Sequence, residues 1–135
     1  MISCVIIRVR NFGGEKMLKG KVKYSLKNNN LFTEYEGNCL YHEDKNILIY
    51  KEKNEMEVMI ELDRLLLTRE NDEMFLMLDF YGGESYVTIK KLDKKMPLVV
   101  TTYSKELKEN SLSISYSLSD DDIFDFYVEW YLGDE

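Results

Sequence analysis

The sequence predicts an all-β fold, a single antiparallel up-and-down β-barrel of about 8–10 strands, with a β-sandwich as the alternative. Three observations predict it: a period of two in hydrophobicity along most of the chain, short connections, and a single proline among 135 residues. Side chains on a strand alternate between two faces, so a period of two places apolar residues on one face and polar residues on the other.

The clearest alternation lies in residues 111–119, where every odd position is serine and every even position is large and apolar. A helix would spread those serines around its circumference and bury several of them. We therefore predict a strand here. Its odd-numbered serines are expected to face water, and its even-numbered side chains, Tyr116 among them, to face the core.

The same alternation recurs in four further segments, and residues 85–89 predict one more strand. The four predicted inner faces are Leu18, Gly20, Val22, Tyr24 and Leu26; Met56, Val58, Ile60 and Leu62; Met74, Leu76, Leu78 and Phe80; and Phe124, Phe126, Val128, Trp130 and Leu132. Met17 falls on the opposite, polar face of the first of these segments.

Turns are expected where Asn, Gly and Asp gather between the strands, at residues 27–30, 81–84 and 120–122. Two segments are less regular. Residues 2–9 are apolar on both faces, and residues 103–110 are compatible with a short helical turn.

The short connections favour antiparallel pairing, because parallel strands need long crossovers. An open sheet of this width would curl, and closure into a barrel removes its exposed edges. The length fits one domain, so residues 1–135 are expected to form a single barrel domain.

The formal net charge of −7 and the sequence pI near 4.9 argue against nucleic acid as the main partner, because phosphate binding needs a basic surface. No apolar run approaches the ~20 residues of a membrane span, and no targeting segment is visible. We therefore expect a cytoplasmic protein with no membrane partner, in which Cys4 and Cys39 are free thiols.

The sequence offers little for catalysis. His42 is the only histidine, which excludes any site built on two imidazoles, and we interpret it as a residue of a surface turn. The glycine pairs are isolated and fit turns better than a phosphate loop. We expect no catalytic residue, no metal ligand and no cofactor, so an enzyme is the least favoured function.

Arg69 is the most informative polar residue. In an unbroken strand it shares a face with Leu65 and Leu67, which directs it to the core or to the barrel mouth. A buried arginine needs an acceptor, and Glu52, which shares a face with Tyr50, is the candidate. Two interpretations stay open: a structural ion pair or an arginine that reaches solvent, and an anchor for an anionic or carbonyl group in a barrel cavity.

A family resemblance involves these same positions. The segments that carry it are Thr33-Glu34-Tyr35-Glu36-Gly37, Ile47-Leu48-Ile49-Tyr50-Lys51-Glu52, Leu66-Leu67-Thr68-Arg69, Phe80, Tyr86-Val87-Thr88, Met96-Pro97-Leu98 and Ser115-Tyr116. In that order the chain resembles the YwiB-like family of small bacterial proteins over residues 31–132. The resemblance implies a closed barrel of the lipocalin-like (calycin) type and brings no activity with it. The chain departs from the family pattern at Lys51-Glu52, where two acidic residues are usual, and at Glu70-Asn71, where a glycine is usual.

If the polar residues near Arg69 all face inward, they form one cluster inside an apolar wall. The candidate ligand-binding residues are Tyr50, Glu52, Arg69, Tyr86, Thr88 and Tyr116. A barrel of about eight strands is just wide enough to fill with side chains or to hold one small ligand.

Two functions remain open, with no preference for an oligomeric state. The first is a module that binds a small, partly apolar ligand in the barrel. The second is a non-catalytic protein-interaction or structural module with a filled barrel and an acidic outer surface around Asp120–Asp122, Asp125 and Glu129.

Overall fold

The computed structural model describes residues 6–8, 16–29, 31–52, 55–119 and 122–133. Within them the strands form one sheet in which every neighbouring pair is antiparallel. The strands are β1 (Ile6–Arg8), β2 (Lys16–Asn28), β3 (Leu31–His42), β4 (Ile47–Lys51), β5 (Glu57–Glu61), β6 (Leu66–Glu70), β7 (Met74–Asp79), β8 (Ser85–Ile89), β9 (Lys94–Leu98), β10 (Val100–Leu107), β11 (Ser111–Leu118) and β12 (Ile123–Leu132). A 3-10 turn, η2 (Lys90–Leu92), joins β8 to β9.

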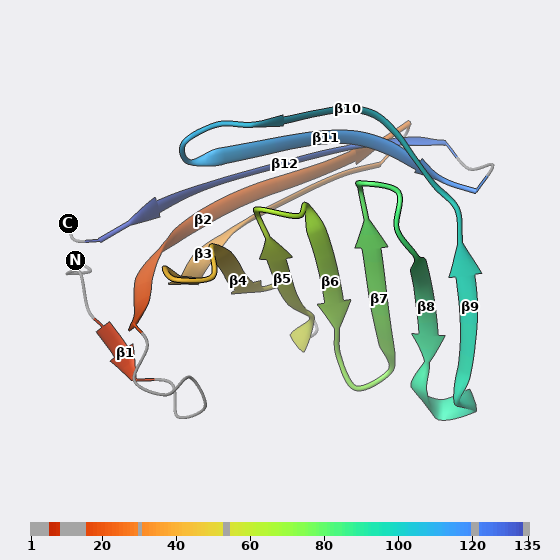
Figure 1. The fold of residues 1–135 in the computed structure, drawn as a ribbon, viewed down its shortest axis with the longest axis horizontal. Helices are drawn as coiled ribbons and strands as arrows, with labels where there is room; N and C mark the ends of the chain where they lie inside the picture. The colour runs from red at the N-terminus through yellow and green to blue at the C-terminus, as the bar shows by residue number, and fades with distance from the viewer. Residues whose placement is uncertain (1–5, 9–15, 30, 53–54, 120–121, 134–135) are drawn as a thin grey trace.

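The sheet closes on itself almost completely. Its order is β10-β11-β12-β2-β3-β4-β5-β6-β7-β8-β9, and β1 adds to β2. The last strand, β12, pairs with β2 from Phe124 opposite Asn28 to Leu132 opposite Gly20, which joins the two ends of the meander. In Figure 1 the long strands β2, β10, β11 and β12 sweep over the shorter strands β5–β9. This nearly closed antiparallel barrel confirms the predicted fold class.

The barrel is open only along one seam of the described sheet, between β9 and β10, which are consecutive in the chain but do not pair. The turn between β7 and β8 contacts β10 beside this seam. The Lys105 Nζ atom lies 4.4 Å from the centre of the Tyr81 ring, and the Thr102 hydroxyl donates to the Phe80 carbonyl at 3.4 Å. Side chains therefore span part of the gap that the backbone leaves unpaired.

The described residues contain twelve strands, more than the number expected. One additional strand is β1. Another is β10, which includes the first part of residues 103–110, where a helical turn was considered. That helical prediction was wrong, because β10 runs on to Leu107. Its pairing with β11 supplies inter-strand hydrogen bonds along this length, interrupted only by a register shift between Thr102 and Ser104.

The predicted inner faces form the core. Val58, Ile60, Leu112, Ile114 and Val128 are all at most 2% exposed. The remaining predicted inward residues are either buried or packed against the same cluster, apart from Leu18, Met56 and Met74. Periodicity alone therefore identified most of the barrel interior.

Ser117 is an exception to the predicted wet face, because it is 3% exposed. The register shift in β10 brings Tyr103 beside it, and the two hydroxyl oxygens lie 3.2 Å apart. The Ser117 hydroxyl therefore has the Tyr103 hydroxyl as its hydrogen-bond partner, where a water molecule was expected.

Met17 and His42 were predicted on the outer face and in a surface turn, and both predictions were wrong. The two residues are opposite one another on β2 and β3, and they are 1% and 0% exposed. Strand β1 covers this end of β2, with Ile7 opposite Met17, and Ile47 lies opposite His42 on β4. Both residues are therefore buried on a face that alternation marks as polar.

The predicted turns are present where the structure describes them. Asn29 has φ of 37° and Gly82 has φ of 92°, values that asparagine and glycine adopt with little strain. The Asp79 carboxylate accepts the N–H of Tyr81 at 2.9 Å and so holds the turn at residues 81–84. The turn predicted at 120–122 lies largely outside the described residues, as does Cys4. Cys39 is a free, buried thiol, and burial raises its pKa to about 12.

Candidate functional site

Four of the six candidate residues face the barrel interior or its mouth. Tyr50 and Tyr116 are buried at 2% and 8% exposure, and Glu52 and Arg69 lie beside them. The other two, Tyr86 and Thr88, do not join them. Each is opposite a β7 residue, Met77 or Phe75, whose side chain points away from the core face of Leu76 and Leu78.

The structure therefore does not bring Tyr86 and Thr88 to the other four candidate residues. The Tyr86 ring contacts Phe75 at 5.9 Å between centroids and Lys95, whose Nζ lies 4.1 Å from the ring centre. Strand β8 is half-buried on both faces, so its alternation is weak and does not reveal which face is inner. The pairing with β7 decides it.

Arg69 and Glu52 form an ion pair at the centre of the candidate site. The Arg69 Nη2 atom donates to Glu52 Oε1 across the intervening strand β5, where Val58 is opposite both Tyr50 and Arg69. The Glu52 side chain is 8% exposed and that of Arg69 is 30% exposed. Glu52 is thus the acceptor that the arginine was predicted to need.

Tyr24 is a member of this site that the sequence did not single out. Its pKa is raised first by burial and then by the nearby Glu52 carboxylate. Its ring lies 5.6 Å from Tyr50 and 5.8 Å from Tyr35, measured between centroids. Alternation marked Tyr24 as inward, but only the pairing of β2 with β3 and β4 brings it to Glu52.

A cleft of about 720 Å³ opens above the ion pair. Its lining comes from the ends of β2, β4 and β6 and the starts of β3, β5 and β7, so it lies at one mouth of the barrel. The lining residues are Tyr24, Thr33, Glu34, Tyr35, Glu52, Glu55, Met56, Arg69, Asn71, Asp72 and Glu73. Among these described residues, five carboxylates face one guanidinium.

The barrel interior beneath the cleft is packed. The void that borders Tyr50, Tyr116 and the ion pair measures about 20 Å³, space for one water molecule. A small ligand lying wholly inside the barrel does not fit this structure. Any ligand of this site must therefore occupy the mouth.

Comparisons with known proteins give one structural neighbour. No protein-family model and no curated protein matches the chain. The crystal structure of the YwiB protein from Bacillus subtilis is similar to it, with a TM-score of 0.52 and 14% sequence identity, over 89% of this chain and 94% of that chain. The two chains share a fold. At this identity the likeness carries no residue of the site from one protein to the other.

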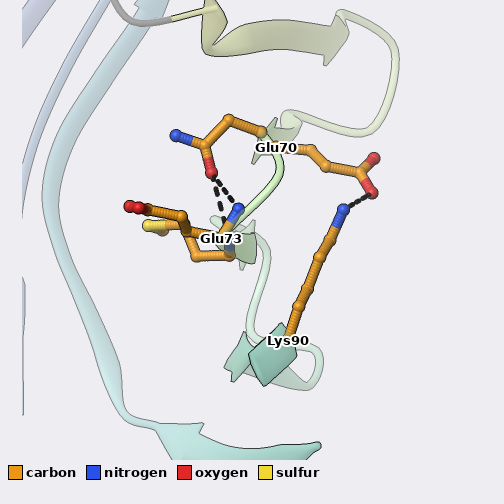
Figure 2. A network of polar contacts seen from close by, with 5 residues as sticks. Glu70, Glu73 and Lys90 are labelled. Atoms are coloured by element: carbon orange, nitrogen blue, oxygen red, sulfur yellow. Dashed lines mark hydrogen bonds and ion pairs between the residues drawn. The ribbon is translucent and has the colours of Figure 1, made fainter. Parts of the chain in front are cut away.

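One wall of the cleft is held by the turn between β6 and β7 (Figure 2). The Asn71 side-chain oxygen accepts the N–H groups of Glu73 at 2.8 Å and of Met74 at 3.0 Å. Lys90 ties the same turn to η2: its N–H donates to the Glu73 carbonyl at 2.9 Å, and its ammonium lies 2.7 Å from Glu70. These contacts fix the backbone that presents Asp72 and Glu73 to the cleft.

The opposite wall carries Tyr35, whose ring lies across Gly37 on the same strand. A Cβ atom at Gly37 would lie 2.5 Å from the Tyr35 hydroxyl and 2.8 Å from its ring carbons. The absence of a side chain at Gly37 therefore leaves the space that the Tyr35 ring occupies in the segment Thr33-Glu34-Tyr35-Glu36-Gly37.

Other chemistry is not indicated in the part of the chain that the structure describes. No group of three His, Cys, Asp or Glu side chains there has the arrangement of a metal site. No helix among the described residues is long and apolar enough to cross a membrane.

Proposed function

We propose that this protein binds a small, positively charged and partly apolar ligand in the cleft at its barrel mouth, and that it does so without catalysis. The observation that carries the proposal is the charge of the cleft. Its volume of about 720 Å³ lies within the usual range of small-molecule sites, and its lining is dominated by carboxylates.

Electrostatics favours a cation over the anionic group first considered for Arg69. The positive charge of Arg69 is already matched by Glu52. The carboxylates of Glu34, Asp72 and Glu73 then set the sign of the field in the cleft, and a cleft of one sign concentrates counter-charged ligands.

The aromatic and apolar lining favours an organic cation over a metal ion. Tyr24 and Tyr35 offer ring faces, on which ammonium groups bind by cation–π attraction. Met56 adds a flexible apolar surface for an alkyl or aryl portion. A primary amine with a short hydrophobic group would complement these features of the cleft.

A second function, a packed barrel that binds another protein through its surface, is favoured by the small interior void. Its surface carries a group of exposed apolar side chains: Leu31 is 70% exposed, Phe32 60% and Ile123 48%. Leu31 and Ile123 flank the same end of β2, since Asn28 is opposite Leu31 and donates to the Ile123 carbonyl.

We further propose that the chain is a YwiB-like protein with a lipocalin-like (calycin) barrel in the cytoplasm. The similarity in fold, together with the sequence segments that resemble this family, supports the relationship. The free thiol of Cys39 supports a reducing compartment.

The binding proposal is tested by isothermal titration with matched amines and carboxylates: butylamine, phenethylamine and 1,4-diaminobutane against butyrate and phenylacetate. We expect saturable binding of amines only, with phenethylamine favoured by the tyrosines. Glu34→Gln and Glu73→Gln should each weaken binding several-fold at low salt, and less at high salt, because exposed charges are screened.

The matched control is Glu106→Gln on β10, an exposed carboxylate outside the cleft. It should leave amine affinity unchanged. Binding of carboxylates in place of amines, or an equal loss in the control, contradicts the proposal. Native mass spectrometry of protein purified from its own cells adds a direct check, since a bound amine raises the mass of the intact protein.

A further inference from the structure

A small void lies inside the packed barrel, next to the ion pair. It measures about 20 Å³ and shares Tyr24, Glu52 and Arg69 with the cleft at the mouth. Its other lining residues are Leu26, Tyr50, Val58, Leu67, Leu76, Leu78, Tyr116 and Phe126. Most cavities among such apolar side chains stay dry, so the polar groups in the wall decide what this one holds.

Two buried polar atoms on this wall have no hydrogen-bond partner among the described residues: the Tyr50 hydroxyl oxygen and Arg69 Nε. Tyr50 is only 2% exposed, so bulk water does not reach it. A buried donor or acceptor without a partner destabilises the folded state. Both residues line one void of the size of a water molecule, so a single molecule there could pair with both atoms.

We propose that this void is a binding site for one water molecule, which accepts the Arg69 Nε–H and hydrogen-bonds to the Tyr50 hydroxyl. A buried water usually makes about three hydrogen bonds. Glu52 and Tyr116 also line this void, and their oxygens would be the acceptors for the protons of the water.

Charge selects water over an ion. An anion in this void would border the Glu52 carboxylate, and a metal cation would border the Arg69 guanidinium. The pair itself is neutral overall, so a neutral molecule that both donates and accepts is the best match. Burial raises the pKa of Tyr50 well above its ordinary value, which keeps the hydroxyl protonated and able to donate.

The water would also position Arg69. The guanidinium is held at Nη2 by Glu52, and a second hydrogen bond at Nε fixes the plane of the group. The floor of the cleft is then joined to the packed interior through Tyr50. This role is independent of which ligand the cleft binds.

A crystal structure at about 1.5 Å resolution, with a second crystal soaked in sodium bromide, tests the site directly. We expect one density peak within about 2.7–3.2 Å of both Tyr50 Oη and Arg69 Nε, without anomalous bromine signal. An empty void overturns the proposal, and so does a bromide peak at the site.

The variant Tyr50→Phe provides a test in solution whose sign is decisive. If the hydroxyl binds a buried water, its removal lowers the melting temperature by about 3–5 °C. If the hydroxyl is truly unpaired, its removal relieves a buried polar group and the melting temperature stays level or rises, which overturns the proposal. Tyr41→Phe, which removes the 2.5 Å hydrogen bond to Asn46, calibrates the loss of one side-chain hydrogen bond.

Discussion

Glu52 and Arg69 form an ion pair across β5, which lies between β4 and β6 in the sheet. Glu52 directly follows β4, and Arg69 lies in β6 opposite Val58. A fully buried valine therefore lies below the ion pair, and the cleft lies above it. The pair is the boundary between the packed interior and the mouth.

Breaking this pair from one side should destabilise the protein more than removing it. Glu52→Gln leaves the partly buried charge of Arg69 without its carboxylate, at an expected cost of about 1–3 kcal/mol in the free energy of unfolding. The double variant Glu52→Leu with Arg69→Met buries no charge and should be closer to wild type. Urea denaturation measures both, and a double variant less stable than Glu52→Gln contradicts this account.

The buried tyrosines predict a loss of stability at high pH. Burial raises the pKa of Tyr116 from 10.0 to about 12. Below pH 10 both the folded and the unfolded states are protonated, and the stability is fully present. Between pH 10 and about 12 the unfolded state loses the phenolic proton first, so the free energy of unfolding falls as pH rises.

Tyr24 and Tyr50 are shifted in the same direction and add to this slope. Urea denaturation at a series of pH values between 9 and 12 should show a shallower fall in Tyr116→Phe than in wild type. An equally steep fall in the variant would show that Tyr116 makes no contribution.

The facing of β11 predicts opposite outcomes for neighbouring substitutions. Ile114 is 2% exposed, and Ile114→Asp should cost several kcal/mol because it places a charge in the core. Ser113 lies on the outer face, and Ser113→Asp should change stability by no more than about 0.5 kcal/mol. Thermal unfolding of the two variants separates these outcomes, and equal destabilisation would refute the facing.

Two glycines on inner faces should respond differently to alanine. At Gly20 a Cβ atom would lie 2.4 Å from the Tyr131 carbonyl oxygen, which cannot move without disturbing the pairing of β12 with β2. Gly20→Ala should therefore cost several kcal/mol. At Gly37 the Cβ atom would meet only the outer part of the Tyr35 ring, which can turn away.

Gly37→Ala should therefore cost about 1 kcal/mol or less, while it displaces Tyr35 and weakens amine binding at the cleft. Chemical unfolding gives the cost, and the NMR shifts of the Tyr35 ring report its displacement. If Gly37→Ala unfolds the protein as readily as Gly20→Ala, the ring is not free to move.

Much of the barrel follows from local alternation. Where one face of a segment is strongly apolar, as in residues 111–116 or 124–132, neighbouring side chains must point oppositely, and the core follows from the sequence. The inward direction of Arg69 and its need for Glu52 follow in the same way, because a buried charge without a partner is costly.

The exceptions share one physical cause, which is pairing between segments distant in the chain. Tyr86 and Thr88 lie outside because β8 takes its facing from β7, and Ser117 is buried because a register shift in β10 brings Tyr103 to it. Met17 and His42 are opposite one another on β2 and β3, and both are buried.

By itself, the sequence determined the antiparallel barrel, most of its inner face and the Arg69–Glu52 pair. Only the tertiary structure decided that Tyr24 completes this site, that five carboxylates converge at the mouth, and that the interior is packed. The reason is that alternation is a property of one strand, since it depends on local backbone geometry. A site built from six strands depends on their register, and register is set by contacts that no single segment encodes.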